Sequence, residues 1–254
     1  MGFGNILGPS SLQQKSLAAL PSAAGLATGT SFEITNYGGN IAVACNGQWR
    51  FEFPFRTTWA GRPPVSAVPV GTELQVTDYA NQKWINDGTY WRPAQGRVII
   101  GNSVTPSVVT GATDMMFTLP TDFKKIPGGM LIPGSRLMCY AEFIKSGANG
   151  ALTPYIRIGT SDSYSDTVVY GVGVPNTNNM LVRASGNVLI GNDGLFDYST
   201  GAVVSPGNGT QFMRSSANFD INADMFMSVH IRGANAADSF TLMSTSIILE
   251  AECS

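Results

Sequence analysis

The chain has 254 residues and a mass of 26.9 kDa, enough for one or two domains with a buried core. Charged residues make up only 13% of it, about half the usual share in globular proteins, and the net charge is -2. Nucleic-acid binding needs concentrated positive charge, so the composition argues against that class. With 29 glycines and 14 prolines, the low charge is typical of a rigid, turn-rich β protein.

No apolar run approaches the length of about 18 residues that a membrane span requires, so we expect no membrane insertion. Residues 1–20 carry Lys15 in their middle and no continuous apolar run, so we expect no signal peptide. The cysteines at 45, 139 and 253 are odd in number and far apart, which indicates free thiols in a reducing cytoplasm rather than disulfides.

Residues 1–30 are rich in Gly, Ser, Ala and Leu and contain too few apolar positions for a core of their own. Ser10 and Ser11 could cap one short helix through Leu20. We interpret residues 1–30 as an extended N-terminal arm or attachment segment.

Residues 31–100 differ sharply from the rest of the chain. All four tryptophans fall between residues 49 and 91, whereas nine of the ten methionines occur from residue 115 onward. This shift, together with turn residues near 101–106, predicts a boundary between 97 and 110. We therefore divide the chain into an arm (1–30), Trp-rich β-hairpin modules (31–100) and a C-terminal head (101–254).

The Trp-rich region repeats itself. Residues 29–37 (GTSFEITNY) align with 71–79 (GTELQVTDY), and 46–50 (NGQWR) align with 87–92 (DGTYWR). Each copy combines an alternating strand with an Asn-Gly or Asp-Gly signal for a hairpin turn. The pattern predicts two small β-hairpin units whose tryptophan rings cover a thin core.

The head is predicted to be a jelly-roll-like β-sandwich, because short apolar or alternating runs recur between turn residues. Eight strands are expected, at 115–119, 136–143, 155–159, 167–174, 180–184, 188–190, 225–231 and 240–250. The predicted fold class of the whole chain is all-β.

Catalytic and metal-binding patterns are missing from the sequence. His230 is the single histidine, and no Gly-x-Ser-x-Gly motif accompanies it, so we expect a strand residue that is packed or hydrogen-bonded. Zinc-ligand spacings, phosphate-binding loops and dinucleotide fingerprints are also missing. We predict no catalytic residue, no metal and no cofactor.

Two acidic residues and two tyrosines remain as candidates. Asp162 and Asp166 could ligate calcium or form a glycosidase pair, although a solvated turn is the favoured interpretation. Exposed aromatic rings bind sugars and other flat apolar faces, so Tyr164 and Tyr198, in predicted loops, are the candidate receptor-binding residues. The tryptophans could serve the same purpose, but core packing is favoured for them.

Two segments carry a family resemblance. Residues 68–79 (VPVGTELQVTDY) with 84–93 (WINDGTYWRP) resemble a small module of tailed-bacteriophage tail fibres and related virion proteins. Residues 123–137 (FKKIPGGMLIPGSRL) and 155–159 (YIRIG) are similar to the β-sandwich heads that follow such modules. Ile132 stands where the family usually has Gly, and the earlier repeat is less similar.

The resemblance implies a virion structural protein rather than an enzyme. Such proteins are generally homotrimers, bound to other virion proteins by their N-terminal end, and they lack catalytic residues. We therefore expect a short tail fibre, assembled in the host cytoplasm, whose C-terminal loops bind a host surface polysaccharide. The alternatives are a head fibre or capsid decoration protein, a carbohydrate-active esterase or glycosidase on a β-sandwich, and a cell-surface lectin.

Overall fold

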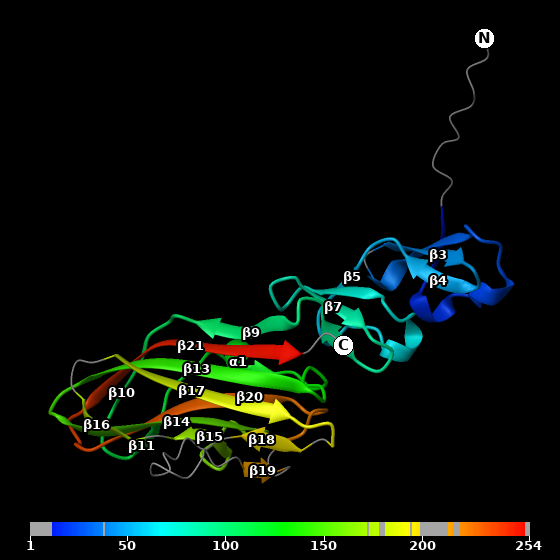
Figure 1. The fold of residues 1–254 in the computed structure, drawn as a ribbon. Helices are drawn as coiled ribbons and strands as arrows, with labels where there is room; N and C mark the ends of the chain where they lie inside the picture. Colours follow the sequence, from blue (N-terminus) through cyan, green and yellow to red (C-terminus); the bar gives the residue numbers. More distant parts are fainter. Residues whose placement is uncertain are drawn as a thin grey trace. The chain divides into compact units, whose positions relative to one another are not determined.

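The computed structural model describes residues 12–37, 39–171, 173–177, 181–193, 195–198, 213–215 and 219–251. In these residues strands predominate and helix is limited to single turns, which confirms the all-β prediction (Figure 1). The chain divides into two compact units, Met1–Ala94 and Gln95–Ser254.

The described part of the first unit contains two four-stranded sheets, in the orders β1-β2-β3-β4 and β5-β6-β7-β8. In each sheet the first two strands are parallel and the others antiparallel. The strands are β1 (Gln13–Lys15), β2 (Ser31–Ile34), β3 (Asn40–Cys45), β4 (Gln48–Phe51), β5 (Phe55–Thr57), β6 (Glu73–Val76), β7 (Gln82–Asn86) and β8 (Trp91–Pro93). Short 3-10 turns are η1 (Leu17–Ala19), η2 (Ala23–Gly25), η3 (Thr35–Tyr37) and η4 (Val65–Ala67).

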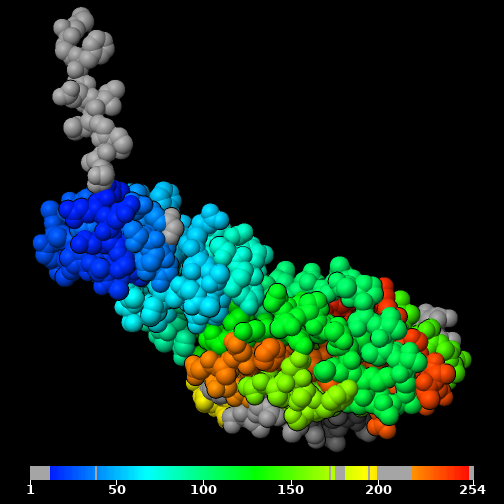
Figure 2. Space-filling model, turned by 180° about the vertical axis from the view of Figure 1, so that it is seen from behind, coloured from blue at the N-terminus to red at the C-terminus, as the bar shows by residue number. Residues whose placement is uncertain are grey.

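The two sheets are copies of one arrangement, because residues 42 positions apart make equivalent hydrogen bonds. The indole Nε1 of Trp49 donates to the carbonyl of Pro21 at 3.0 Å, and that of Trp91 donates to the carbonyl of Pro63 at 2.9 Å. Figure 2 shows the surface of the first copy, in blue, beside that of the second, in cyan.

A second pair of equivalent bonds joins the start of each copy to the turn after its second strand. The amide of Leu17 donates to Asn36 Oδ1 at 3.0 Å, and the amide of Trp59 donates to Asp78 Oδ1 at 2.9 Å. Each copy is therefore closed by contacts between residues about 20 positions apart, which a strand pattern alone does not reveal.

The first copy begins earlier than predicted. β1 pairs in parallel with β2, Gln13 opposite Phe32, and Leu17 is only 9% exposed. Residues 12–30 are therefore part of the first copy and not of an arm, and the short helix expected up to Leu20 is reduced to η1. A three-residue strand is too short to show alternation, which explains the error. Residues 1–11, the rest of the predicted arm, lie outside the described residues.

The predicted Asn-Gly hairpin is confirmed between β3 and β4. Asn46 and Gly47 both have positive φ, 52° and 76°, as a two-residue type I′ turn requires. Asparagine and glycine tolerate this region of backbone space better than other residues, so the turn sets the register of β4 against β3.

Three of the four tryptophans form the core of the first unit, as expected. Trp59 and Trp84 are at most 2% exposed, with ring centroids 4.6 Å apart, and Trp91 is 4% exposed. Trp49 is only partly buried, although it occupies the position equivalent to Trp91.

The second unit is a β-sandwich with one turn of α-helix, α1 (Thr121–Lys124) (Figure 1). One described sheet contains β10, β21, β13, β17, β18 and β19 in that order, with β9 also on β21; the other contains β11, β20, β14 and β15, with β12 on β20 and β16 on β14. These strands are β9 (Arg97–Ser103), β10 (Ser107–Thr110), β11 (Asp114–Met116), β12 (Lys125–Ile126), β13 (Ser135–Ser146), β14 (Gly150–Gly159), β15 (Thr167–Gly171), β16 (Val174–Thr177), β17 (Leu181–Ile190), β18 (Phe196–Tyr198), β19 (Met213–Ser215), β20 (Met225–Gly233) and β21 (Ser239–Ala251).

The sandwich core lies between the inner faces of the two sheets. Residues that point into this core from β13 and β20 are fully buried, including Leu137, Phe143, Met227, Val229 and Ile231. β15 and β14 pack against β17 of the facing sheet. Burying one face of each sheet in this way is the usual source of stability in a sandwich.

Three predicted boundaries in the head were wrong. The strands expected at 180–184 and 188–190 are one strand, β17, since Gly186 continues it while admitting Val169 of the facing sheet: a Cβ there would lie 3.1 Å from Val169 Cγ2. The strand expected at 167–174 is divided into β15 and β16. The unit begins at Gln95, before the predicted 97–110, because β9 pairs with β21.

We predict that Trp91→Ala lowers the free energy of unfolding of the first unit by about 3–5 kcal/mol, because it empties a buried site. Trp49→Ala, at the equivalent but partly exposed site, should cost less than half as much. All four tryptophans lie in the first unit, so denaturant titration followed by tryptophan fluorescence measures it selectively. Equal losses for the two variants would contradict the different burial of these sites.

Candidate functional site

Tyr164 lies in the loop between β14 and β15 and is 50% exposed, as the loop prediction requires. Its hydroxyl accepts a hydrogen bond from the amide of Met116 at 3.1 Å. Its ring packs edge-on against the His230 ring, with centroids 4.7 Å apart. One side of Tyr164 is therefore occupied by the protein itself.

Tyr198 was predicted in a loop, and this placement is wrong. It is the last residue of β18, is 5% exposed and packs against Phe219, with ring centroids 5.7 Å apart. The residues around Tyr198 are polar, as in a loop, and this misled the prediction. The backbone there is a strand because β18 pairs with β17. Because Tyr198 is buried, it cannot join Tyr164 in an exposed aromatic site.

His230 is a buried, hydrogen-bonded strand residue, as predicted. It is 0% exposed in β20, and its Nε2 lies 2.9 Å from Oγ of Ser228. Its Nδ1 lies 3.4 Å from Oδ1 of Asp114, whose Oδ2 accepts from Arg157 at 3.1 Å.

In space, Ser228, His230 and Asp114 contact one another in the same sequence as the residues of a hydrolase triad. Their spacing in the amino-acid sequence did not reveal this arrangement. Ser228 is only 2% exposed, and Tyr164 covers the imidazole, so a substrate carbonyl has no room beside the hydroxyl. This arrangement supports packing of the sheet rather than catalysis.

The two candidate carboxylates also have structural partners. Asp166 is 3% exposed and accepts from Ser161 Oγ at 2.5 Å, whereas Asp162 pairs with Lys124. Among the described residues no group of three or more His, Cys, Asp or Glu could hold a metal ion. Cys45 and Cys139 are free thiols; burial raises the pKa of Cys139 to about 12, and Cys253 lies outside the described residues.

The outer face of the sheet that contains β13 and β17 carries several exposed apolar side chains. Tyr140, Leu181 and Leu189 are 38%, 51% and 42% exposed on it, and Val108 on β10 is 60% exposed. The register places Leu181 opposite Ile144 and Leu189 opposite Arg136. Its charges are of both signs, with Glu142 bound to Arg183 at 2.7 Å.

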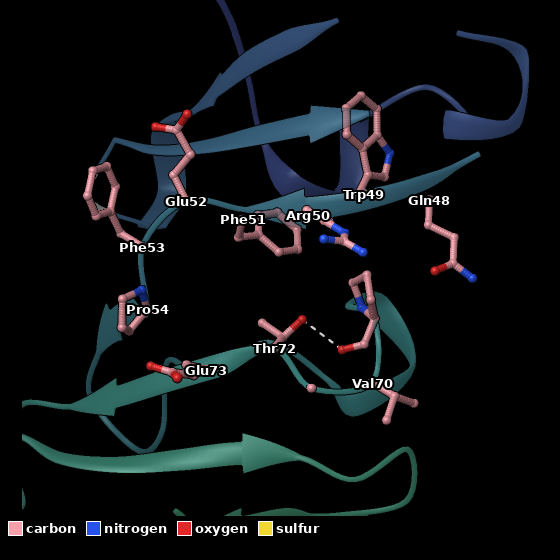
Figure 3. A pocket seen from close by; sticks show the side chains of 12 residues that line it. Gln48, Trp49, Arg50, Phe51, Glu52, Phe53, Pro54, Val70, Thr72 and Glu73 are labelled. Atoms are coloured by element: carbon pink, nitrogen blue, oxygen red, sulfur yellow. Dashed lines mark hydrogen bonds between the residues drawn. The ribbon is translucent and has the colours of Figure 1, made fainter. Parts of the chain in front are cut away.

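A groove follows the outer edge of β4 in the first unit. Its volume is about 460 Å³, and its walls are residues 48–54 of the first copy and residues 69–73 of the second (Figure 3). The exposed side chains on these walls are mostly polar, with Val70 at 71% and Phe53 at 60% exposure. The polar ones are Gln48, Arg50, Glu52 and Glu73.

A second hollow of about 450 Å³ adjoins this groove, because Gln48, Trp49, Phe51 and Pro69 line both. Its other walls are mainly apolar: Leu17, Leu20, Pro21, Ala23, Ala67 and Val68 are among them. A polar hollow and an apolar hollow therefore meet along one strand.

The outer edge of β4 carries backbone groups without partners. The amide of Glu52 donates to Ile41 on β3 at 3.0 Å. Hydrogen-bonded positions alternate along an antiparallel pair, so the backbone of Arg50 faces β3, while that of Trp49 and Phe51 faces outward. Among the described residues, neither outward-facing backbone has a hydrogen-bond partner.

The groove is rigidly built. The indole of Trp49 is held by Pro21, and the Phe51 ring packs edge-on against Phe55 with centroids 4.6 Å apart. The side-chain amide of Asn40, 4% exposed, donates to the carbonyl of Phe53 at 2.5 Å and accepts from its amide at 3.2 Å. Sequence reasoning assigned Trp49 to the core and missed this groove.

No protein-family model matches the chain, and no curated protein matches it. A solved structure of infectious bursal disease virus, Gx strain, is similar at a TM-score of 0.22 and 12% identity, over 61% of this chain and 39% of that one. A protein from Bacteroides thetaiotaomicron described as sugar-binding is similar at 0.24 and 9% identity, over 95% and 99%.

The chain thus spans about two fifths of the length of the viral protein that it matches. TM-scores of this size establish neither a shared fold nor a shared function. No helix in the described residues is long and apolar enough to cross a membrane.

We predict that His230→Gln makes the protein less sensitive to acid between about pH 7 and pH 5. Burial, reinforced by Arg157 and opposed by Asp114 and Asp162, lowers the pKa of His230. The unfolded chain then binds the proton more readily than the folded chain, so acidification through this range favours unfolding.

Melting temperatures of both proteins, measured by calorimetry at closely spaced pH values, check this prediction. Wild type should lose more stability than the variant as the pH falls. Parallel curves would show that His230 does not contribute.

Proposed function

We propose that this chain is a virion structural protein: a short homotrimeric tail fibre, attached by its N-terminal end to other virion proteins, whose C-terminal loops bind a host surface polysaccharide. The resemblance of residues 68–93 and 123–159 to phage fibre proteins supports the proposal. Two small β modules ahead of a β-sandwich are compatible with it. The role is structural rather than catalytic.

The observation that carries the proposed assembly is the set of exposed apolar side chains on the outer face of the sheet with β13 and β17. Exposed Leu181, Leu189, Tyr140 and Val108 would be unfavourable in water but suit an interface, whose core is depleted of charge. The occupant we propose is a second copy of the chain. Arg136 and the Glu142–Arg183 ion pair share this face, so it carries charges of both signs and does not repel a second copy as a face of one sign would.

The trimer also accounts for the low charge of the chain. With 13% charged residues, a monomer would expose more uncharged surface than is usual. Three copies that cover this face would hide part of that surface. Three copies of a loop such as that of Tyr164 would then contact the host surface together, and their weak contacts would combine into a higher avidity.

We predict that light scattering on the full chain gives three times the chain mass of 26.9 kDa. The double variant Leu181→Glu/Leu189→Glu should lower the mass to that of one chain, because both side chains are exposed on this face and a buried carboxylate is costly. Thr160→Glu, at an exposed loop position, is the matched control. A monomeric wild type, or a double variant that remains trimeric, would contradict the proposed interface.

A further inference from the structure

We propose that the outer edge of β4 binds an extended strand of a partner protein, which adds to the first sheet beside Trp49 and Phe51. This inference goes beyond the virion role, because it requires neither the trimer nor the host receptor. Every contact that carries it lies within the first unit.

The backbone of β4 has an open outer edge. The outward-facing N–H and C=O groups of Trp49 and Phe51 form a short row with no partner among the described residues. Such a row is a template for another strand, and strand addition to an open edge is a common mode of peptide recognition.

The other copy of the repeat has a closed edge at the equivalent position. The residue 42 positions after Phe51 is Pro93, in the edge strand β8. Proline has no N–H, so it blocks strand addition, and natural sheets protect their edges in this way. Two copies that share their internal hydrogen bonds thus differ at the position where a strand could be added.

The walls of the groove suit the two sides of an added strand. Side chains of an added strand point alternately to its two sides. One hollow beside β4 offers Gln48, Arg50 and Glu52, and the other offers Leu17, Leu20 and Val68. A strand with alternating polar and apolar residues would therefore fill both.

The charges in the polar hollow restrict the partner further. Glu52 and Glu73 outnumber Arg50 there, and Lys83 partly offsets Glu73 at 3.6 Å. The polar positions of the partner strand should therefore be uncharged or basic rather than acidic. Since the rings of Trp49 and Phe51 and the backbone of Phe53 are already held in place, little ordering of these parts of the groove opposes binding.

Selection of linear 12-residue peptides from a displayed random library on the full chain tests the proposal. Peptides with alternating apolar and polar residues should be enriched. Phe51→Pro should weaken their binding about tenfold or more, because it removes an edge N–H and adds a ring that obstructs pairing. Phe51→Ala keeps the N–H and is the matched control, so it should weaken binding less.

If Phe51→Pro alters the tryptophan fluorescence of the folded chain, Val70→Trp replaces it as the test. Val70 is 71% exposed on the opposite wall, so a larger side chain there fills the groove without disturbing the core. It should also reduce peptide binding by at least about tenfold.

Four results would overturn the proposal. The first is a selection that enriches no alternating peptide, and the second is equal weakening by Phe51→Pro and Phe51→Ala. The third is displacement of the peptides by maltohexaose or cellohexaose, which would identify a sugar site that uses the exposed ring of Phe53. The fourth is self-association of the chain that Phe51→Pro abolishes, which would assign the edge to a second copy.

Discussion

A hydrogen bond from a tryptophan indole to a proline carbonyl 28 residues earlier holds each copy of the repeat in the first unit together. Trp49 binds Pro21, and Trp91 binds Pro63, so in both copies the segment that precedes the hairpin is fastened to its last strand. The same bond has different consequences in the two copies. Around Trp91 it completes a buried core, whereas around Trp49 it fixes one wall of an open groove.

This difference fits a general pattern in duplicated modules. Once the internal bonds of a copy are satisfied, the outward-facing backbone of its edge strand takes no part in them and is free to change. Pro93 closes the edge in one copy, and Phe51 leaves it open in the other. The head shows a related division: the inner faces of its sheets build the core, while Leu181 and Leu189 on an outer face remain exposed.

Much of this architecture could be predicted from residue order. The Asn46-Gly47 turn and the strand pattern after Gly29 and Gly71 have local signals, and both elements are found. The parallel strand β1 could not be predicted, because three residues carry no period and their partner β2 lies far along the chain. The prediction that Tyr198 lies in a loop was wrong for the same reason. Its strand pairs with β17, and the residues next to Tyr198 in the sequence carry no sign of that pairing.

The candidate groove depends on sheet order, which no local pattern contains. A comparison of the two copies does offer one signal: Phe51 and Pro93 stand at equivalent positions and differ in their ability to donate a hydrogen bond. For Ser228, His230 and Asp114 the reverse holds, because here the geometry suggests a function that burial argues against. Their geometry alone suggests chemistry, and only the burial of Ser228 and His230 assigns them to packing.

Hydrogen exchange of the Trp49 and Phe51 amides, measured by NMR with and without a selected peptide, tests the open edge most directly. In the free protein these two amides should exchange rapidly, while those of Arg50 and Glu52, which face β3, should be protected. The peptide should slow exchange at Trp49 and Phe51. Protection of both amides in the free protein, or no change when the peptide binds, would contradict the account.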